Sequence, residues 1–224
     1  MFEPNPPTAT PPVVDRAHFD EALAAQVTAE KEVTRHNDRV SATRRRLPMV
    51  EVQDYTFTAP EGPVRLTELF GEKYLLLVQN VMFGPDWDEG CPSCTWAVDN
   101  LPANMERVAD EGIAFAMVSQ APVAKLEAWR TRQGWDHRWV SSHDTTHHHD
   151  WGWTQRAVDG SEVHHPGYSY YLLHAGTPYL TYTTRARGTE AVLPTAHIMD
   201  RTVYGRQQDW EDSPPGWPQA PTYG

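Results

Sequence analysis

The chain has 224 residues, 39% of them hydrophobic, which suffices for a single domain built around one core. Its 30 acidic residues outnumber 19 lysines and arginines, and the formal net charge of -11 argues against nucleic acid or an anionic membrane as the principal partner. A small molecule or a protein thiol is therefore the expected partner.

The N-terminal segment, residues 1–14, contains five prolines and few apolar side chains, which predicts a disordered arm. It lacks the charged, apolar and cleavage regions of a secretory signal, so we expect a cytoplasmic protein. The sequence also has no run of about 18 apolar residues, the length needed for a membrane-spanning helix.

Residues 15–47 follow as a long predicted helix. Phe19, Leu23, Val27 and Val33 recur near a period of 3.6 residues, and a proline ends the pattern at position 48. A helix of this length outside a core usually packs along its own domain or onto another subunit. We therefore expect it to support a homodimer.

Strands and helices alternate in residues 48–205, and an irregular Pro- and Trp-rich tail is predicted for residues 206–224. The expected fold class is α/β, with a mixed central sheet flanked by helices. In chain order, strands are expected at residues 50–58, 74–83, 113–120, 137–142, 168–174 and 178–186, and helices within 63–71 (one short turn), 95–110 (interrupted near Pro102), 121–134 and 189–202.

The chain has only two cysteines, Cys91 and Cys94, and they form a CxxC pair directly after the predicted buried strand 74–83. At the start of a helix, backbone N–H groups and the helix dipole stabilise a thiolate on the first cysteine, and the second can resolve a mixed disulfide. Three nearby acids, Asp86, Asp88 and Glu89, disfavour that thiolate if they lie close. Two alternatives are a pair of buried structural thiols and a structural zinc site, although zinc needs four ligands.

Four segments carry a family resemblance: VTRHNDRVSATRRRLP, FGPDWDEGCPSC, VSQAPVAKLEAWRTRQGWDHRWVSS and YTTRARGTE. They resemble a bacterial thioredoxin-like family of unknown function in the redoxin branch of the thioredoxin superfamily, over roughly residues 20–205. The resemblance implies a thioredoxin-like fold with Cys91 and Cys94 at the redox position, and it supplies no substrate. Ser169 stands where thioredoxins have a cis-proline, which puts docking of a substrate disulfide by the usual backbone ladder in doubt.

Where relatives are expected to have an aromatic, Ser- and Asn-bearing stretch, this chain reads HDTTHHHDWGWTQ. Parallel strands end at one edge of a sheet, so the loops after strands 74–83 and 137–142 should meet there. Imidazole and thiolate together suit copper, zinc or iron, and a redox role favours copper. The predicted ligands of this metal site are Cys91, Cys94, His143, His147, His148 and His149, with His164 and His165 as weaker candidates.

Two other interpretations of the histidines stay open. They can form a solvated loop without a specific role, or His143, which directly follows a strand, can act as a general base for Cys91. Beyond the histidines, Arg185 and Arg187 are candidates for binding a substrate carboxylate, or they only pair with surface acids.

Two tryptophans near these loops, Trp87 and Trp151, are candidates for the wall of an apolar substrate pocket, although tryptophans more often belong to a core. The sequence as a whole predicts a thioredoxin-like oxidoreductase acting on a thiol or small-molecule substrate. The alternatives are a copper-dependent oxidoreductase of a small molecule and a non-catalytic metal-binding module.

Overall fold

The computed structural model describes residues 9–102 and 105–220. The chain divides into two compact units, one formed by Met1–Leu47 with Thr195–Gly224 and the other by Pro48–Pro194. Of the predicted disordered arm, residues 1–8 lie outside the described part, and residues 9–14 have no regular secondary structure.

The first unit contains the long predicted helix α1 (Arg16–Arg44). Asp15 caps its start by accepting a hydrogen bond from the backbone N–H of His18. No side chain of α1 is buried, and Phe19, Leu23 and Val33 are among its exposed apolar residues. Within residues 9–102 and 105–220, no helix combines the length and apolar character that crossing a bilayer requires.

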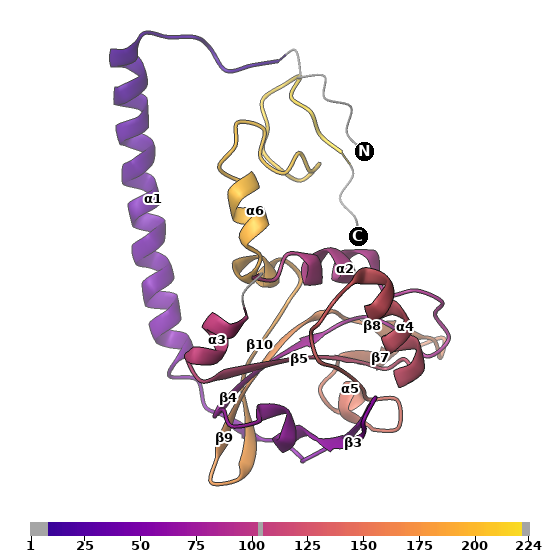
Figure 1. Ribbon diagram of the computed structural model, residues 1–224. Helices are drawn as coiled ribbons and strands as arrows, with labels where there is room; N and C mark the ends of the chain where they lie inside the picture. The colour runs from indigo at the N-terminus through magenta and orange to yellow at the C-terminus, as the bar shows by residue number, and fades with distance from the viewer. Residues whose placement is uncertain (1–8, 103–104, 221–224) are drawn as a thin grey trace. The chain divides into compact units, whose positions relative to one another are not determined.

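The second unit is built on an eight-stranded mixed sheet (Figure 1). Its strand order is β1-β10-β9-β4-β5-β6-β2-β3, in which β5 pairs in parallel with β4 and β6 while the remaining pairs are antiparallel. The strands are β1 (Val50–Glu51), β2 (Thr56–Ala59), β3 (Gly62–Arg65), β4 (Leu75–Asn80), β5 (Ile113–Ser119), β6 (Trp139–Ser141), β9 (Gly167–His174) and β10 (Thr177–Arg185). The predicted mixed α/β architecture is confirmed.

The helices of this unit follow the predicted order. They are η1 (Leu66–Phe70), α2 (Pro92–Asp99), α3 (Glu106–Asp110), α4 (Val123–Gln133), α5 (His147–Asp150) and η2 (Ala186–Val192). The predicted interruption within residues 95–110 separates α2 from α3, with residues 103–104 outside the described part. At the C-terminal side, the expected helix 189–202 is instead the 3-10 helix η2 followed by α6 (Pro194–Met199).

The predicted strand 50–58 is broken, because the chain turns between β1 and β2. The backbone N–H of Tyr55 donates to the carbonyl of Gln53, and the Asp54 carboxylate accepts from both the backbone N–H and the hydroxyl of Thr67. An aspartate that binds backbone in this way favours a turn over a continuous strand.

The two faces of the sheet carry separate hydrophobic clusters, because successive strand residues point to opposite sides. Val118 and Val140 belong to one cluster, together with residues of η1 and β2. Met117 and Trp139, their neighbours in sequence, belong to the other, which contains both cysteines and residues of α2 and α4. Figure 1 shows α2 and α4 on one side of the sheet and η1 with α5 on the other.

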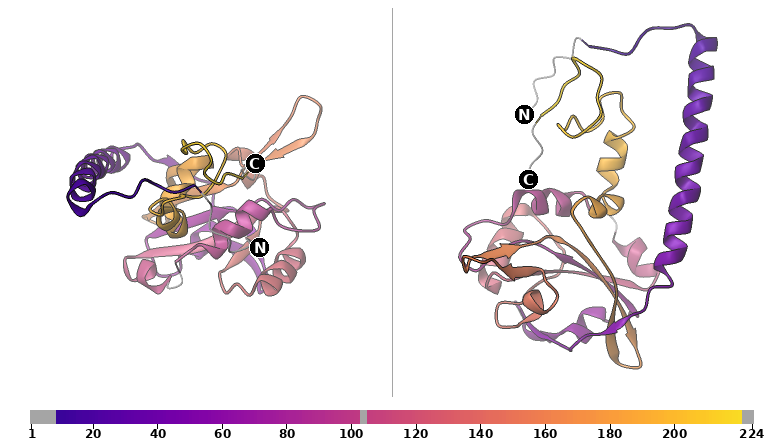
Figure 2. Two further views of the ribbon diagram at one scale, coloured as in Figure 1. Left: turned by 90° about the horizontal axis from the view of Figure 1, so that it is seen from above. Right: turned by 180° about the vertical axis from the view of Figure 1, so that it is seen from behind.

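The histidine-rich stretch forms α5 and then a small hairpin of β7 (Thr154–Arg156) and β8 (Glu162–His164). This hairpin projects from the main sheet (Figure 2).

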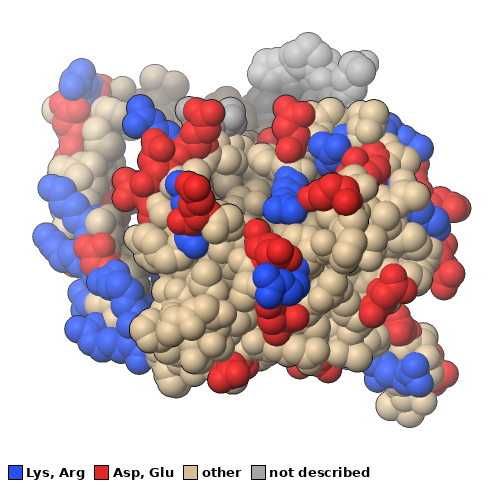
Figure 3. Space-filling view, turned by 60° about the horizontal axis from the view of Figure 1, so that its bottom comes forward, with Lys and Arg blue, Asp and Glu red and all other residues tan. Residues whose placement is uncertain are grey.

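Charged side chains of both signs are interspersed on the face shown in Figure 3. Some of them form ion pairs, such as Arg138 with Glu61 at 2.7 Å and Arg130 with Glu127 at 2.8 Å.

Candidate functional site

The cysteine pair lies where β4 leaves the sheet and α2 begins. Cys91 is the N-cap residue of α2, and Pro92 occupies the first helical position, where a missing N–H is tolerated. The backbone of Met82 fixes both cysteines, because its carbonyl accepts from the N–H of Cys91 at 3.0 Å and its N–H donates to the sulfur of Cys94 at 3.4 Å. Both cysteines are free thiols.

Hydrogen bonds to its sulfur lower the pKa of Cys91 to about 5. The thiol of Cys94 contributes most, opposed by burial, and the side chain of Ser93 and the backbone N–H groups of Ser93 and Cys94 add to the lowering. The Ser93 hydroxyl lies 3.0 Å from the sulfur of Cys91. Cys91 is therefore a thiolate at neutral pH, which is the nucleophilic form.

Cys94 is perturbed in the opposite direction. Its pKa is raised, first because its S–H donates to Cys91, then by burial and by the charge of the Cys91 thiolate. The side chain is only 3% exposed. The pair therefore shares one proton, which Cys94 holds, and Cys91 is the sulfur prepared to react.

The three acids expected to disfavour the thiolate do not determine the ionisation of Cys91. Asp86, Asp88 and Glu89 are all exposed, where water screens their charges. Glu89 also forms an ion pair with Arg132 at 3.0 Å. Hydrogen bonds at the start of α2 thus outweigh the nearby negative charges.

Aromatic side chains enclose the pair. Phe83, Trp129 and Trp139 belong to the same buried cluster as the cysteines, and Trp87 packs against it while partly exposed. The preceding loop is held by Lys125, whose ammonium group donates to the carbonyl oxygens of Pro85 and Trp87 at 2.7 and 2.9 Å. Cys91 is 8% exposed, so little of this residue is open to solvent.

The structure does not bring His147 together with the cysteines. Its ring meets the rings of Tyr55 and Phe57 edge-on at 5.1 and 5.2 Å, and these belong to the cluster on the opposite face of the sheet. Burial lowers the pKa of His147 to about 4, so the imidazole is neutral. His147 is a core residue in this structure.

His148, His143 and His149 each contact a different polar partner. Nδ1 of His148 lies 2.7 Å from the hydroxyl of Ser142, and Nδ1 of His143 lies 3.2 Å from the carbonyl oxygen of Gln120. His143 is exposed. Its contact with Gln120 does not test the role of general base for Cys91, which stays a prediction. His149 faces Glu162, with 3.5 Å between Nε2 and a carboxylate oxygen.

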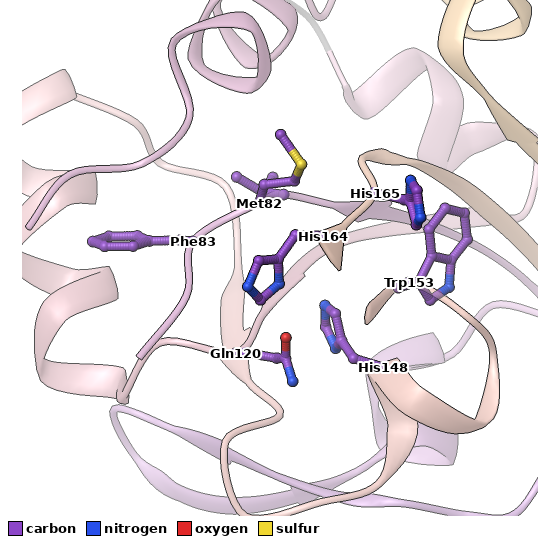
Figure 4. A pocket seen from close by; sticks show the side chains of 8 residues that line it. Met82, Phe83, Gln120, His148, Trp153, His164 and His165 are labelled. Atoms are coloured by element: carbon purple, nitrogen blue, oxygen red, sulfur yellow. The ribbon is translucent and has the colours of Figure 1, made fainter. Parts of the chain in front are cut away.

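A recess lies beside the cysteine loop, and residues of that loop and of the histidine-rich segment line it (Figure 4). Met82 and Phe83 line it from the loop after β4, and the side chains of Gln120, His148 and His164 converge on it. Val81, Trp153 and His165 complete its lining.

The predicted copper centre receives no support from this arrangement. In the described part of the chain, no three His, Cys, Asp or Glu side chains are positioned to hold a metal ion. Copper binding by Cys91, Cys94 and the histidines therefore stays a prediction.

The predicted substrate-binding residues have other partners. The guanidinium of Arg185 lies 4.1 Å above the Trp153 ring and donates to the carbonyl of Trp151 at 2.9 Å. Arg187 pairs with Glu190 at 2.9 Å.

The two tryptophans expected to share a pocket pack against different clusters, Trp87 on the cysteine side and Trp151 on the other.

Sequence reasoning missed two residues of the site. Ser93 contacts the sulfur of Cys91, and its position inside the CxxC was the available signal. Tyr168 is 1% exposed, and its hydroxyl has no hydrogen-bond partner among the described residues. Its pKa is raised first by burial and then by electrostatic interaction with Tyr170 and Cys94. Tyr168 reads as a core aromatic in a strand, so no pattern distinguished it.

The sheet, the helices on its two faces and a reduced CxxC at the start of α2 define a thioredoxin-like α/β protein. Two solved structures share this fold: a mutant PrxQ of Xylella fastidiosa, 10% identical with a TM-score of 0.51, and Peroxidoxin BcpB of Mycobacterium tuberculosis, 14% identical with a TM-score of 0.51. The matches cover 67% of this chain and 94% of the first, and 68% of this chain and 97% of the second.

Residues 8–222 match the model of the family described as "Bacterial protein of unknown function (DUF899)", and the chain belongs to that family. Comparison of the chain with curated proteins found no match.

Proposed function

We propose that the protein is a dithiol–disulfide oxidoreductase in which Cys91 is the nucleophile and Cys94 the resolving thiol. The observation that carries the proposal is the opposite perturbation of the two thiols: the pKa of Cys91 is lowered and that of Cys94 is raised within one hydrogen-bonded pair. Such a pair keeps one sulfur ionised and the other protonated until it is needed.

The reaction proceeds in two exchanges. The Cys91 thiolate attacks one sulfur of a substrate disulfide, forming a mixed disulfide and releasing the other substrate sulfur as a thiolate. Cys94 then loses its proton and attacks the Cys91 sulfur, which releases the second substrate thiolate. The substrate gains two electrons and, from solvent and Cys94, two protons, while the protein dithiol becomes a disulfide. The reverse sequence oxidises a substrate dithiol.

A small-molecule disulfide fits this site better than a folded protein. Cys91 is 8% exposed and enclosed by aromatic side chains, so a substrate sulfur has to enter a confined space. Trp87 is partly exposed and lies four residues before Cys91, which supports a contact between its ring and the rest of the substrate.

Hydroperoxides are the second candidate substrate, because the two fold neighbours are a PrxQ and a peroxidoxin. In that reaction the Cys91 thiolate attacks the O–O bond, giving a sulfenic acid and an alcohol or water. Cys94 condenses with the sulfenic acid, which releases water and forms the same disulfide.

The test uses the reduced full chain with hydroxyethyl disulfide in one arm and hydrogen peroxide in the other. We expect fast consumption of both thiols with the disulfide, a persistent mixed disulfide on Cys91 in Cys94→Ser, and no adduct in Cys91→Ser. Faster reaction with peroxide, accompanied by a sulfenic acid in Cys94→Ser, would select the second candidate. An inert wild-type protein in both arms would reject thiol-based catalysis.

A further inference from the structure

Tyr168 is a buried side chain that the dithiol exchange does not use. It is the second residue of β9, it is 1% exposed, and its hydroxyl has no hydrogen-bond partner among the described residues. A buried hydroxyl without a partner destabilises a fold, and a phenylalanine would fill nearly the same space without that cost. The hydroxyl therefore calls for a role other than packing.

The pairing register places Tyr168 on the face of the sheet that carries the cysteines. Tyr168 is opposite Gln79 of β4, and Gln79 is opposite Met117 of β5. Residues opposite one another in neighbouring strands project to the same face. Because Met117 belongs to the cluster that contains Cys91 and Cys94, Tyr168 shares a face of the sheet with the redox pair.

The polar side chains around Tyr168 do not use its hydrogen. The side-chain oxygen of the opposite residue, Gln79, is also buried without a hydrogen-bond partner among the described residues. Ser169, the next residue of β9, projects to the other face, where its hydroxyl accepts from Nδ2 of Asn80 at 3.1 Å. The hydroxyl on that face has a partner, whereas the Tyr168 hydroxyl keeps a hydrogen that it can donate.

Cys94 is the group on this face that has to ionise during the second exchange. It packs in one cluster with Val81, which lies two residues beyond Gln79, or about 7 Å along the strand. Burial first, and then electrostatic interaction with Tyr170 and Cys94, raise the pKa of Tyr168, so its hydroxyl stays protonated at neutral pH. A neutral O–H that interacts with Cys94 can stabilise a negative charge on that sulfur.

On the basis of the dithiol exchange proposed above, we propose that the Tyr168 hydroxyl stabilises the Cys94 thiolate in the second exchange by donating its hydrogen toward that sulfur. In this step Cys94 gives up its proton to solvent, and its sulfur forms a bond to the Cys91 sulfur. The bond between Cys91 and the substrate breaks, and the substrate sulfur leaves with the electron pair and takes up a proton. Tyr168 keeps its own proton throughout.

The first exchange does not depend on this hydroxyl. Cys91 is ionised mainly by the hydrogen bond from Cys94, with further contributions from Ser93 and the backbone N–H groups at the start of α2. Removing the Tyr168 hydroxyl should therefore slow the attack of Cys94 and leave the attack of Cys91 unchanged. A hydroxyl with a purely structural role would not separate the two steps.

The experiment forms the mixed disulfide first and then starts the second exchange. The reduced full chain reacts with hydroxyethyl disulfide at pH 5, where Cys91 is about half ionised because its pKa is about 5, while Cys94 stays protonated. Rapid removal of the reagent and a jump to pH 7 start the attack of Cys94. Mass spectrometry of acid-quenched samples then follows the loss of the mixed disulfide.

We expect Tyr168→Phe to form the mixed disulfide at the wild-type rate and to resolve it about tenfold more slowly, because a hydrogen bond to a charged sulfur is lost. The reduced variant should be at least as stable as the wild type in urea, because the missing hydroxyl had no partner among the described residues.

Tyr171→Phe is the matched control. It removes an equally buried tyrosine hydroxyl from the opposite face of the sheet, 3.5 Å from Nε2 of His147, and should resolve the mixed disulfide like the wild type.

Equal resolution rates in Tyr168→Phe and the wild type would overturn the proposal, and so would an equal slowing of both exchanges in that variant. A wild-type protein that forms no mixed disulfide would reject the dithiol exchange itself, and the role of Tyr168 with it. The two failures are distinguishable, because the first exchange is measured separately and on the wild type before any variant is compared.

Discussion

Ser93 and Cys94 supply the hydrogen bonds that ionise Cys91, so the reactivity of one sulfur depends on two neighbours. Ser93→Ala removes one donor and should raise the pKa of Cys91 while leaving the fold intact. The measurement is the rate of Cys91 alkylation by iodoacetamide against pH, which we expect to have a midpoint near 5 in the wild type and a higher one in the variant.

Thr95→Ala is the matched control for this measurement, because the Thr95 hydroxyl donates to the carbonyl of Cys91 and not to its sulfur. An unchanged midpoint in Ser93→Ala would contradict the assigned hydrogen bond.

His147 should make the protein sensitive to acid. Its pKa is about 4 in the folded chain, lowered from 6.5 by burial, so the unfolded chain binds a proton more readily. Stability is therefore complete above pH 6.5 and falls as the pH drops toward 4, by about 3 kcal/mol in total. Urea unfolding across this range measures the free energy of unfolding.

The variant that isolates this effect is His147→Gln, which cannot titrate. It should be less stable at neutral pH, because the ring contacts with Tyr55 and Phe57 are lost, but its pH dependence should be flatter. An equally steep acid dependence in the variant would assign the effect to other groups, such as the buried His148.

The CxxC pair was predictable from its spacing and its place after an apolar strand, whereas the fate of the histidines was not. Whether a histidine faces the cysteines or the opposite side of the sheet depends on the short helix α5, which has only four residues. Hydrophobic periodicity is visible only over a longer segment than this, so the sequence did not predict that His147 lies in the core.

At the scale of elements, the parallel strands β4, β5 and β6 were predictable because each is a short apolar run followed by a helical pattern or turn. The hairpin of β9 and β10 was also expected, and its turn uses positive φ angles of 50° at Ala175 and 82° at Gly176. The break between β1 and β2 was missed, because it depends on the contact of Asp54 with Thr67, thirteen positions along the chain.

Close packing of β9 against β10 makes Gly167 difficult to replace. A Cβ at this position would collide with the backbone carbonyl oxygen of Thr184 and lie 2.8 Å from the Trp153 ring. We expect Gly167→Ala to destabilise the protein by about 2 kcal/mol in urea unfolding.

Gly90→Ala is the matched comparison, because the atoms nearest its Cβ would belong to the Trp129 side chain, at 3.1 Å or more, and not to the backbone. Equal destabilisation by the two substitutions would mean that backbone crowding at Gly167 is not the cause.

At the scale of the whole molecule, we propose that α1 packs against a second copy of the chain. Residues 15–30 contain four acidic residues and one arginine, whereas residues 31–46 contain six basic and two acidic residues. Two copies of α1 packed antiparallel would bring opposite charges together and cover the exposed apolar side chains of Phe19 and Leu23. We expect a homodimer that weakens in high salt.

Sedimentation equilibrium of the full chain measures this association. Leu23→Glu should shift the protein toward monomer, while Thr28→Glu, whose hydroxyl only bonds back to the carbonyl of Ala24, should have a smaller effect. A monomeric wild type at high protein concentration would contradict the expected dimer.

We propose that Cys91 and Cys94 act as one redox couple, in which Cys91 reacts first. The most direct measurement is a titration of the reduced chain with oxidised glutathione, in which mass spectrometry of quenched samples locates each modification. We predict that both thiols disappear together into an intramolecular disulfide, through a glutathione adduct found on Cys91. An adduct that forms first on Cys94, or independent oxidation of the two thiols, would contradict it.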